Sequence, residues 1–174
     1  MDHSTHMSPL PSVVAMGLAG FVLAAVVPGL VLLLRRAPLW ERVSLPAGAA
    51  LPLLVLTHAW AVLAGPAAAL RPPGGSLVTE PVLVAAAVVF WVPVVGRTRH
   101  RLGDPGRCLY LFLAAPLLDL PALGVIAAGH PLEGLAMIVG MLPLAVAAAA
   151  VTWSWANEEE RTTILPPEPD PVTP

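Results

Sequence analysis

The chain has 174 residues, of which 57% are hydrophobic and only 11% are charged, and its mean hydropathy is +0.80. Soluble domains are usually about 25% charged, so the composition predicts an integral membrane protein and excludes a large soluble domain. A net charge of −2 argues against a nucleic-acid partner. The single cysteine, Cys108, excludes an internal disulfide and a multi-cysteine metal site.

Five apolar segments approach the length of about 20 residues that a membrane-spanning helix needs. We expect these spans at 11–34, 44–65, 78–96, 108–128 and 131–156. The predicted fold class is therefore all-α, a polytopic membrane bundle of five transmembrane helices. No basic region precedes the first span, so we expect it to be retained as an anchor. The predicted organisation is an extracytoplasmic segment at 1–10, a transmembrane domain at 11–157 and a cytoplasmic, proline-rich tail at 158–174.

Every predicted span contains proline. In lipid, neighbouring helices and side chains can satisfy the carbonyl groups that proline leaves without a partner. We therefore predict that the helices continue through these prolines and are kinked there. The prolines are Pro28, Pro52, Pro93, Pro116, Pro121 and Pro143.

The arginines are distributed unevenly among the loops, and there is no lysine. The loops after the first and third spans carry most of them, whereas the N-terminal segment and the last loop carry none. Cytoplasmic loops of membrane proteins hold the excess of positive charge. This bias predicts an N-terminus outside and a C-terminus inside a bacterial plasma (inner) membrane. The second loop holds only Arg71, and the arginines of the loops after the first and third spans are Arg35, Arg36, Arg42, Arg97, Arg99, Arg101 and Arg107.

Ionisable side chains inside a membrane are costly, which makes His58 and Asp119 candidates for function. At about 1.5 Å per residue, they lie roughly 10 and 15 Å below the outer ends of their spans. Met137 and Met141 lie on one face of the fifth span, and antiparallel packing would bring Asp119 and Met141 level. Imidazole suits copper and thioether selects Cu(I). The pattern predicts a path for copper in the outer half of the bundle, in which these side chains bind the copper ion.

Each of these residues also has a structural interpretation. His58 would be a packed, hydrogen-bonded histidine, and Asp119 a protonated acid bonded to a carbonyl that Pro121 or a neighbour frees. Met137 and Met141 would be core side chains. Outside them, His130 and Glu133 lie near the outer surface with Glu80, where an acid at a helix start favours the helix dipole.

The N-terminal segment holds a second candidate site, formed by His3, His6 and Met7. A free amine, two amides and the imidazole of His3 would bind Cu(II) in a plane of four nitrogens, a geometry typical of Cu(II) or Ni(II). The alternatives are that translation begins at Met7 or that the first residues are an appended tag.

No enzyme signature is present in the sequence: we find no nucleophile elbow, no glycine-rich phosphate loop and no His-Glu-x-x-His. We therefore expect a protein that is not an enzyme. The basic segment 97–107 is expected to fix topology and contact anionic lipid.

Four stretches of the second half resemble the CtaG-like membrane proteins associated with assembly of caa3-type cytochrome c oxidases. They are Val89-Phe-Trp-Val-Pro-Val-Val-Gly96, Leu109-Tyr-Leu-Phe-Leu-Ala-Ala-Pro116, Gly134-Leu-Ala-Met137 and the ending from Trp153 to Arg161. The resemblance implies a multi-pass inner-membrane protein concerned with copper delivery to a terminal oxidase.

The chain departs from that family in having five expected spans instead of about seven, and His58 in place of several histidine-rich motifs. Two functions follow. The first is copper handling or assembly in support of a copper-dependent oxidase complex. The second is a structural accessory subunit of a membrane copper enzyme, either a terminal oxidase or a particulate monooxygenase, with no metal of its own. Both imply membrane lipid and a larger copper-enzyme complex as partners.

Overall fold

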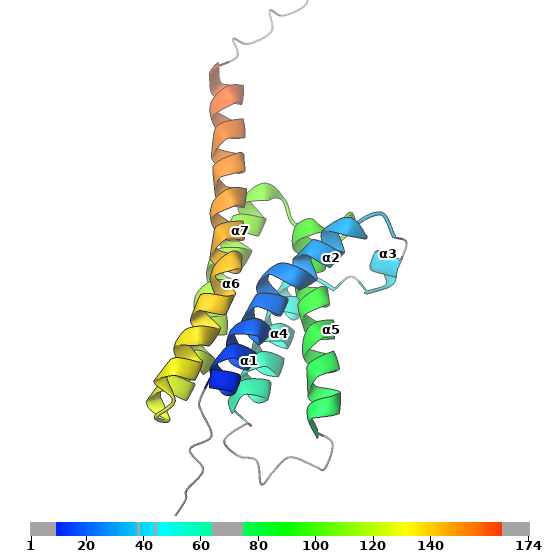
Figure 1. Ribbon diagram of the computed structural model, residues 1–174. Coiled ribbons are helices and arrows are strands. Elements are labelled where there is room, and N and C mark those ends of the chain that lie inside the picture. Colours follow the sequence, from blue (N-terminus) through cyan, green and yellow to red (C-terminus); the bar gives the residue numbers. More distant parts are fainter. Residues whose placement is uncertain (1–9, 38, 44, 64–74, 165–174) are drawn as a thin grey trace, which may run out of the picture.

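A computed structural model describes residues 10–37, 39–43, 45–63 and 75–164, and helix is the only regular structure in these ranges (Figure 1). The all-α prediction is thus confirmed for the described residues. The elements are α1 (Leu10–Phe21), η1 (Val22–Val26), α2 (Val27–Leu33), α3 (Leu39–Val43), α4 (Ala47–Leu63), α5 (Gly75–Val95), α6 (Asp104–Ala127) and α7 (Pro131–Ile164).

Four helical segments are long and apolar enough to cross a membrane: Leu10–Leu33, Val78–Val95, Asp104–Ala127 and Pro131–Arg161. This supports the prediction of a membrane protein. The remaining predicted span, 44–65, contains α4, an apolar helix of 17 residues. At 1.5 Å per residue α4 is about 26 Å long, slightly less than the hydrocarbon core of about 30 Å. The count of five spans therefore stays a prediction.

Two helices extend beyond the ranges that hydropathy predicts. α6 begins at Asp104 instead of 108, because the extended Gly103 and Pro105 in the first turn form a favourable helix start. α7 continues to Ile164 instead of ending at 156, because hydrophobicity falls before the helix ends. The five-residue helix α3 is an element that the sequence did not predict.

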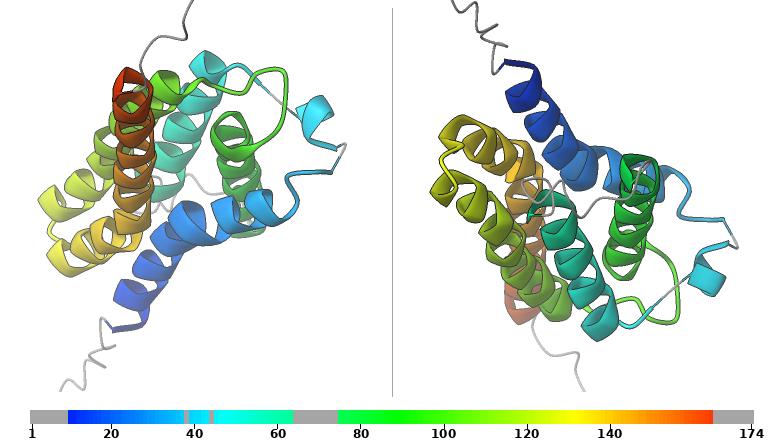
Figure 2. Two further views of the ribbon diagram at one scale, coloured as in Figure 1. Left: turned by 90° about the horizontal axis from the view of Figure 1, so that it is seen from above. Right: turned by 90° about the horizontal axis from the view of Figure 1, so that it is seen from below.

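The helices form one bundle in which α7 packs against α1 and α6, while α4 packs against α5 and α6 (Figure 2). α6 and α7 are antiparallel and joined by a turn at Gly129, whose φ is 91°. The N–H of Gly129 donates to Ile126 O and that of His130 donates to Val125 O. This pair of bonds is a Schellman motif, for which glycine is the preferred residue.

The first helical segment changes its winding at Pro28, because η1 is a turn of π-helix. The N–H of Val27 donates to Val22 O instead of Leu23 O, and Pro28 has no N–H to offer. The carbonyl of Leu23 therefore has no partner in its own helix. The indole Nε1 of Trp91, on α5, donates to it at 2.9 Å. This bond couples α5 to the proline turn, as expected for a carbonyl in a dry interior.

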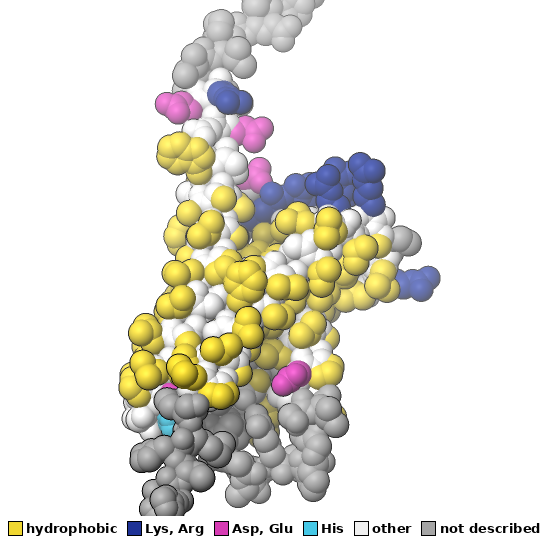
Figure 3. Space-filling model, viewed as in Figure 1, with side chains coloured by type: hydrophobic (Ala, Val, Ile, Leu, Met, Phe, Trp, Pro, Cys, Tyr) yellow, Lys and Arg dark blue, Asp and Glu magenta, His cyan; other side chains and the backbone are white. Residues whose placement is uncertain are grey.

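Charged residues mark the two ends of the bundle differently (Figure 3). We call the end where α2 and α5 finish and α6 begins the basic end. It carries Arg35, Arg36, Arg97, Arg99, Arg101 and Arg107. We call the opposite end, with the Gly129 turn, the turn end. α7 projects past the basic end and carries Glu158, Glu159 and Glu160 on its projecting part.

Candidate metal site

His58 lies in the interior of the bundle on the face of α4 that also carries Leu54 and Val62, one turn to either side. Its side chain is 2% exposed. The ring faces the backbone of Leu118 on α6 as a potential hydrogen-bond partner, but by strict distance and angle neither ring nitrogen has a hydrogen bond within the described part of the chain. Buried polar groups are almost always bonded, so His58 is an exception that calls for an explanation.

Met137 and Met141 are both buried on α7, with exposures of 2% and 5%. Met137 belongs to a cluster with Val62, Ala122 and Val125, against which Met16 of α1 packs. Three thioether side chains therefore lie in the half of the bundle nearer the turn end.

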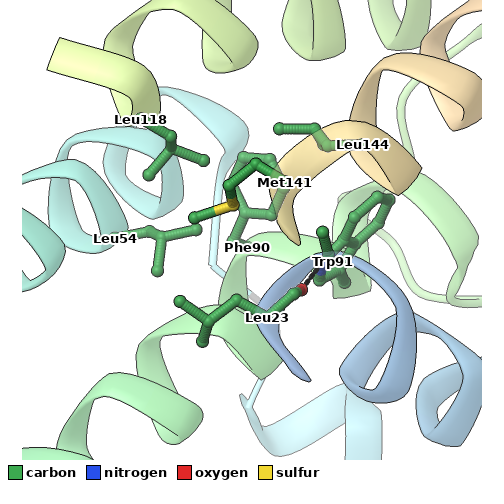
Figure 4. Close-up of a pocket in the computed structure, with 8 residues that line it drawn as sticks. Leu23, Leu54, Phe90, Trp91, Leu118, Met141 and Leu144 are labelled. Atoms are coloured by element: carbon green, nitrogen blue, oxygen red, sulfur yellow. Dashed lines mark hydrogen bonds between the residues drawn. The ribbon is translucent and has the colours of Figure 1, made fainter. Parts of the chain in front are cut away.

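Met141 lines a small internal cavity with Leu54 and Leu118 (Figure 4). Figure 4 shows its thioether extending toward Leu54, with Phe90 beside it. The cavity measures about 10 Å³, at the lower limit for a single water-sized occupant.

The register of α4 and α7 follows from these shared neighbours. α4 runs toward the turn end and α7 runs away from it. Leu54 shares the cavity with Met141, and Val62 shares the smaller cluster with Met137. His58 is midway between Leu54 and Val62, so its ring lies at a depth between those of the two methionines. His58 and the two methionines thus lie at similar depths in the bundle, although the cavity that Met141 lines includes neither His58 nor Met137.

Asp119 lies on a different face of α6 from Leu118, which lines the internal cavity. It is half-buried and lines an open cleft of about 50 Å³ between α6 and α7, together with Met141 and Ile138. Among the described residues it forms no hydrogen bond or ion pair, so the expected bond to a carbonyl near Pro121 is not seen. Met141 and Leu144 line both this cleft and the internal cavity, so these two side chains lie between Asp119 and the cavity.

The polar residues of the turn end form a separate group. Glu133 Oε1 accepts a hydrogen bond from Ser12 Oγ at 3.1 Å and lies 3.8 Å from His130 Nδ1. The Ser12 bond joins α1 to the start of α7. Glu80 is exposed near the start of α5. Of this group, Glu133 ties α7 to α1 through Ser12 at the surface, away from the buried His58.

Across the described residues no three or more His, Cys, Asp or Glu side chains gather at one point. The other predicted site, formed by His3, His6 and Met7, lies outside the described residues.

Close helix contacts position the methionines, and sequence reasoning missed them. A Cβ on Gly20 would lie 2.9 Å from Met137 O, and a Cβ on Gly140 would collide with Gly17 O. α1 and α7 thus pack backbone to backbone on both sides of Met137. Small residues at helical spacing are the usual sequence signal for such a contact in membranes. Gly17 and Gly20 have this spacing and could have predicted the contact.

No family description, curated protein or solved structure matches this chain.

Proposed function

We propose that this protein is a multi-pass protein of the bacterial plasma (inner) membrane that handles copper and is not an enzyme. In this proposal it helps Cu(I) reach, or supports assembly of, a copper-dependent oxidase complex. The observation that carries the proposal is the buried imidazole of His58, which has no well-formed hydrogen bond and lies at a depth between those of Met137 and Met141.

The chemistry of these side chains favours Cu(I) over harder ions, because thioethers select soft metals and imidazole suits copper. A buried polar group without a partner costs about 1–3 kcal/mol. Binding a metal through one nitrogen of His58 would offset this cost. The other nitrogen would donate to a backbone carbonyl, as metal-bound histidines usually do, and the backbone of Leu118 is the nearest candidate.

A route for the ion is part of the proposal. Asp119 lines the open cleft between α6 and α7, and Met141 lines both that cleft and the internal cavity. Rotation of the Met141 thioether would pass a soft ion from the cleft into the internal cavity, toward the depth at which His58 lies. With the turn end outside the cytoplasm, as the arginine bias favours, His3, His6 and Met7 would collect copper on the same side of the membrane.

An anaerobic titration of the purified full-length protein against a coloured Cu(I) chelator tests the proposal. We expect one Cu(I) per chain that the chelator removes at least tenfold more easily from His58→Leu and from a Met137→Leu, Met141→Leu double variant. His130→Gln is the matched control, because His130 is exposed at the turn end. The site would be refuted if the unaltered protein retained no Cu(I), or if the His130→Gln control were the variant that lost Cu(I) while the others kept it.

The outer site is tested separately with Cu(II). We expect His3→Gln, His6→Gln to lose Cu(II) binding while the Cu(I) titration stays unchanged. Equal loss of both metals would show that the two candidate sites are one.

The length of α7 favours the second candidate function, a structural accessory subunit without its own metal. Its 34 residues span about 51 Å, roughly 20 Å more than the hydrocarbon core. The projecting part would contact a partner complex. This function predicts that a copper enzyme co-purifies in fixed ratio and that His58→Leu leaves the ratio unchanged.

A further inference from the structure

We propose that the turn after α2 is a binding site for the headgroup of one anionic phospholipid. Arg35 and Arg36 form the site with Leu32 and Leu33, which line one open cleft of about 420 Å³ at the basic end. The proposal is independent of copper handling.

The order of residues in the cleft matches the cross-section of a bilayer leaflet. Leu32 and Leu33 are 46% and 81% exposed at the last turn of α2, at the level where acyl chains begin. Arg35 and Arg36 follow and are exposed, at the level of the headgroups. A lipid seated here would place its chains on leucine and its phosphate on guanidinium.

The two guanidinium groups are available for a phosphate. Among the described side chains neither Arg35 nor Arg36 forms an ion pair or hydrogen bond. Two other arginines of the basic end are engaged: Arg107 pairs with Asp104 at 3.0 Å, and Arg99 donates to His100 Nε2 at 3.1 Å. Arg97 and Arg101 are exposed like Arg35 and Arg36, so what distinguishes the pair is its place in the cleft. Arginine binds phosphate through two parallel hydrogen bonds, so an adjacent pair suits a phosphodiester.

The backbone that carries the pair is held in place. Leu34 O accepts hydrogen bonds from the N–H of Ala37 at 2.8 Å and from the indole of Trp40 at 2.5 Å. Trp40 is 7% exposed and packs in the main core, so it anchors the turn between α2 and α3. A site held in its binding geometry loses less entropy when the ligand binds.

The occupant is an anionic phospholipid and not a soluble anion, because half of the cleft is apolar. Basic segments beside a membrane helix attract anionic lipid with about 1 kcal/mol per arginine. That attraction alone would treat all arginines of the basic end alike. The cleft predicts a stronger and site-specific effect at Arg35 and Arg36.

Native mass spectrometry of the full-length protein, titrated in detergent with phosphatidylglycerol, tests this inference. We expect one tightly retained lipid whose affinity falls at least tenfold in R35Q/R36Q. The matched control R99Q/R101Q removes the same charge from the same end and is expected to change the affinity less than twofold. Both pairs are exposed, and circular dichroism checks that each variant keeps its helices.

Three results would overturn the inference. Equal weakening by the control pair would mean that only the diffuse charge of the basic end matters. Equal retention of phosphatidylcholine would mean that the acyl chains alone are bound. Displacement of the lipid by millimolar inorganic phosphate would mean that the site takes a free anion. R36Q alone, with a smaller but measurable loss, serves if the double variant does not fold.

Discussion

The contact between α1 and α7 predicts a strong effect of a single added methyl group at Gly140. The Cβ of an alanine would collide with Gly17 O and would lie 3.1 Å from the N of Phe21. Both atoms belong to the backbone of α1, so no side chain can rotate away. Relief requires that the two helices move apart, which would also shift Met137 and Met141.

The expected size follows from two opposing terms. Overpacking costs typically about 1–3 kcal/mol, and a collision with fixed backbone places Gly140→Ala near the upper value. Alanine gains about 1 kcal/mol over glycine in a helix interior. The net loss of unfolding free energy is therefore about 2 kcal/mol. Gly29→Ala is the matched control, because its Cβ would meet nothing within 4 Å, and we expect it to gain up to about 1 kcal/mol.

Reversible unfolding in mixed micelles, followed by circular dichroism, measures both variants against the unaltered protein. We expect the two to differ by about 3 kcal/mol, with opposite signs. If Gly140→Ala and Gly29→Ala agreed within about 0.5 kcal/mol, the backbone contact of α1 with α7 would be wrong, and with it the placement of Met137.

Two further predictions use the same unfolding assay. Trp91→Phe removes the indole donor to Leu23 O, and leaving this buried carbonyl unpaired should lower the unfolding free energy by about 1–3 kcal/mol. Trp153 is 73% exposed, so Trp153→Phe should change the unfolding free energy little. Equal effects of the two substitutions would contradict the role of the bond. His58→Leu should leave the metal-free protein as stable or more stable, because it removes two unbonded buried nitrogens. A loss above about 2 kcal/mol would mean that His58 is a structural residue.

The sequence predicted the helical class and the approximate helix positions, because long apolar runs leave little choice of structure in lipid. It could not predict the π-turn at Pro28 or its remedy. The sequence shows that Pro28 lacks an N–H. The donor that bonds to the carbonyl of Leu23 instead is Trp91, which is 68 residues away from Leu23. Such a pairing depends on how the helices pack, which hydropathy does not contain.

For the candidate site, the sequence predicts residue types and approximate depths, but not which face of its helix each side chain occupies. Asp119 and His58 are both intramembrane polar residues, and depth alone does not separate them. The structure places Asp119 in the open cleft between α6 and α7 and His58 in the interior. Adjacent residues on a helix point about 100° apart. Without knowing which face of the helix is buried, the sequence cannot tell a side chain in the interior from one in an open cleft.

X-ray absorption at the copper edge tests the central claim most directly, on the full-length protein loaded with one equivalent of Cu(I). We predict mixed nitrogen and sulfur ligation that becomes sulfur-only in His58→Leu and loses sulfur in the Met137→Leu, Met141→Leu variant. A spectrum with only nitrogen or oxygen neighbours, or one that neither variant changes, would contradict a copper site at the depth of His58 in the bundle.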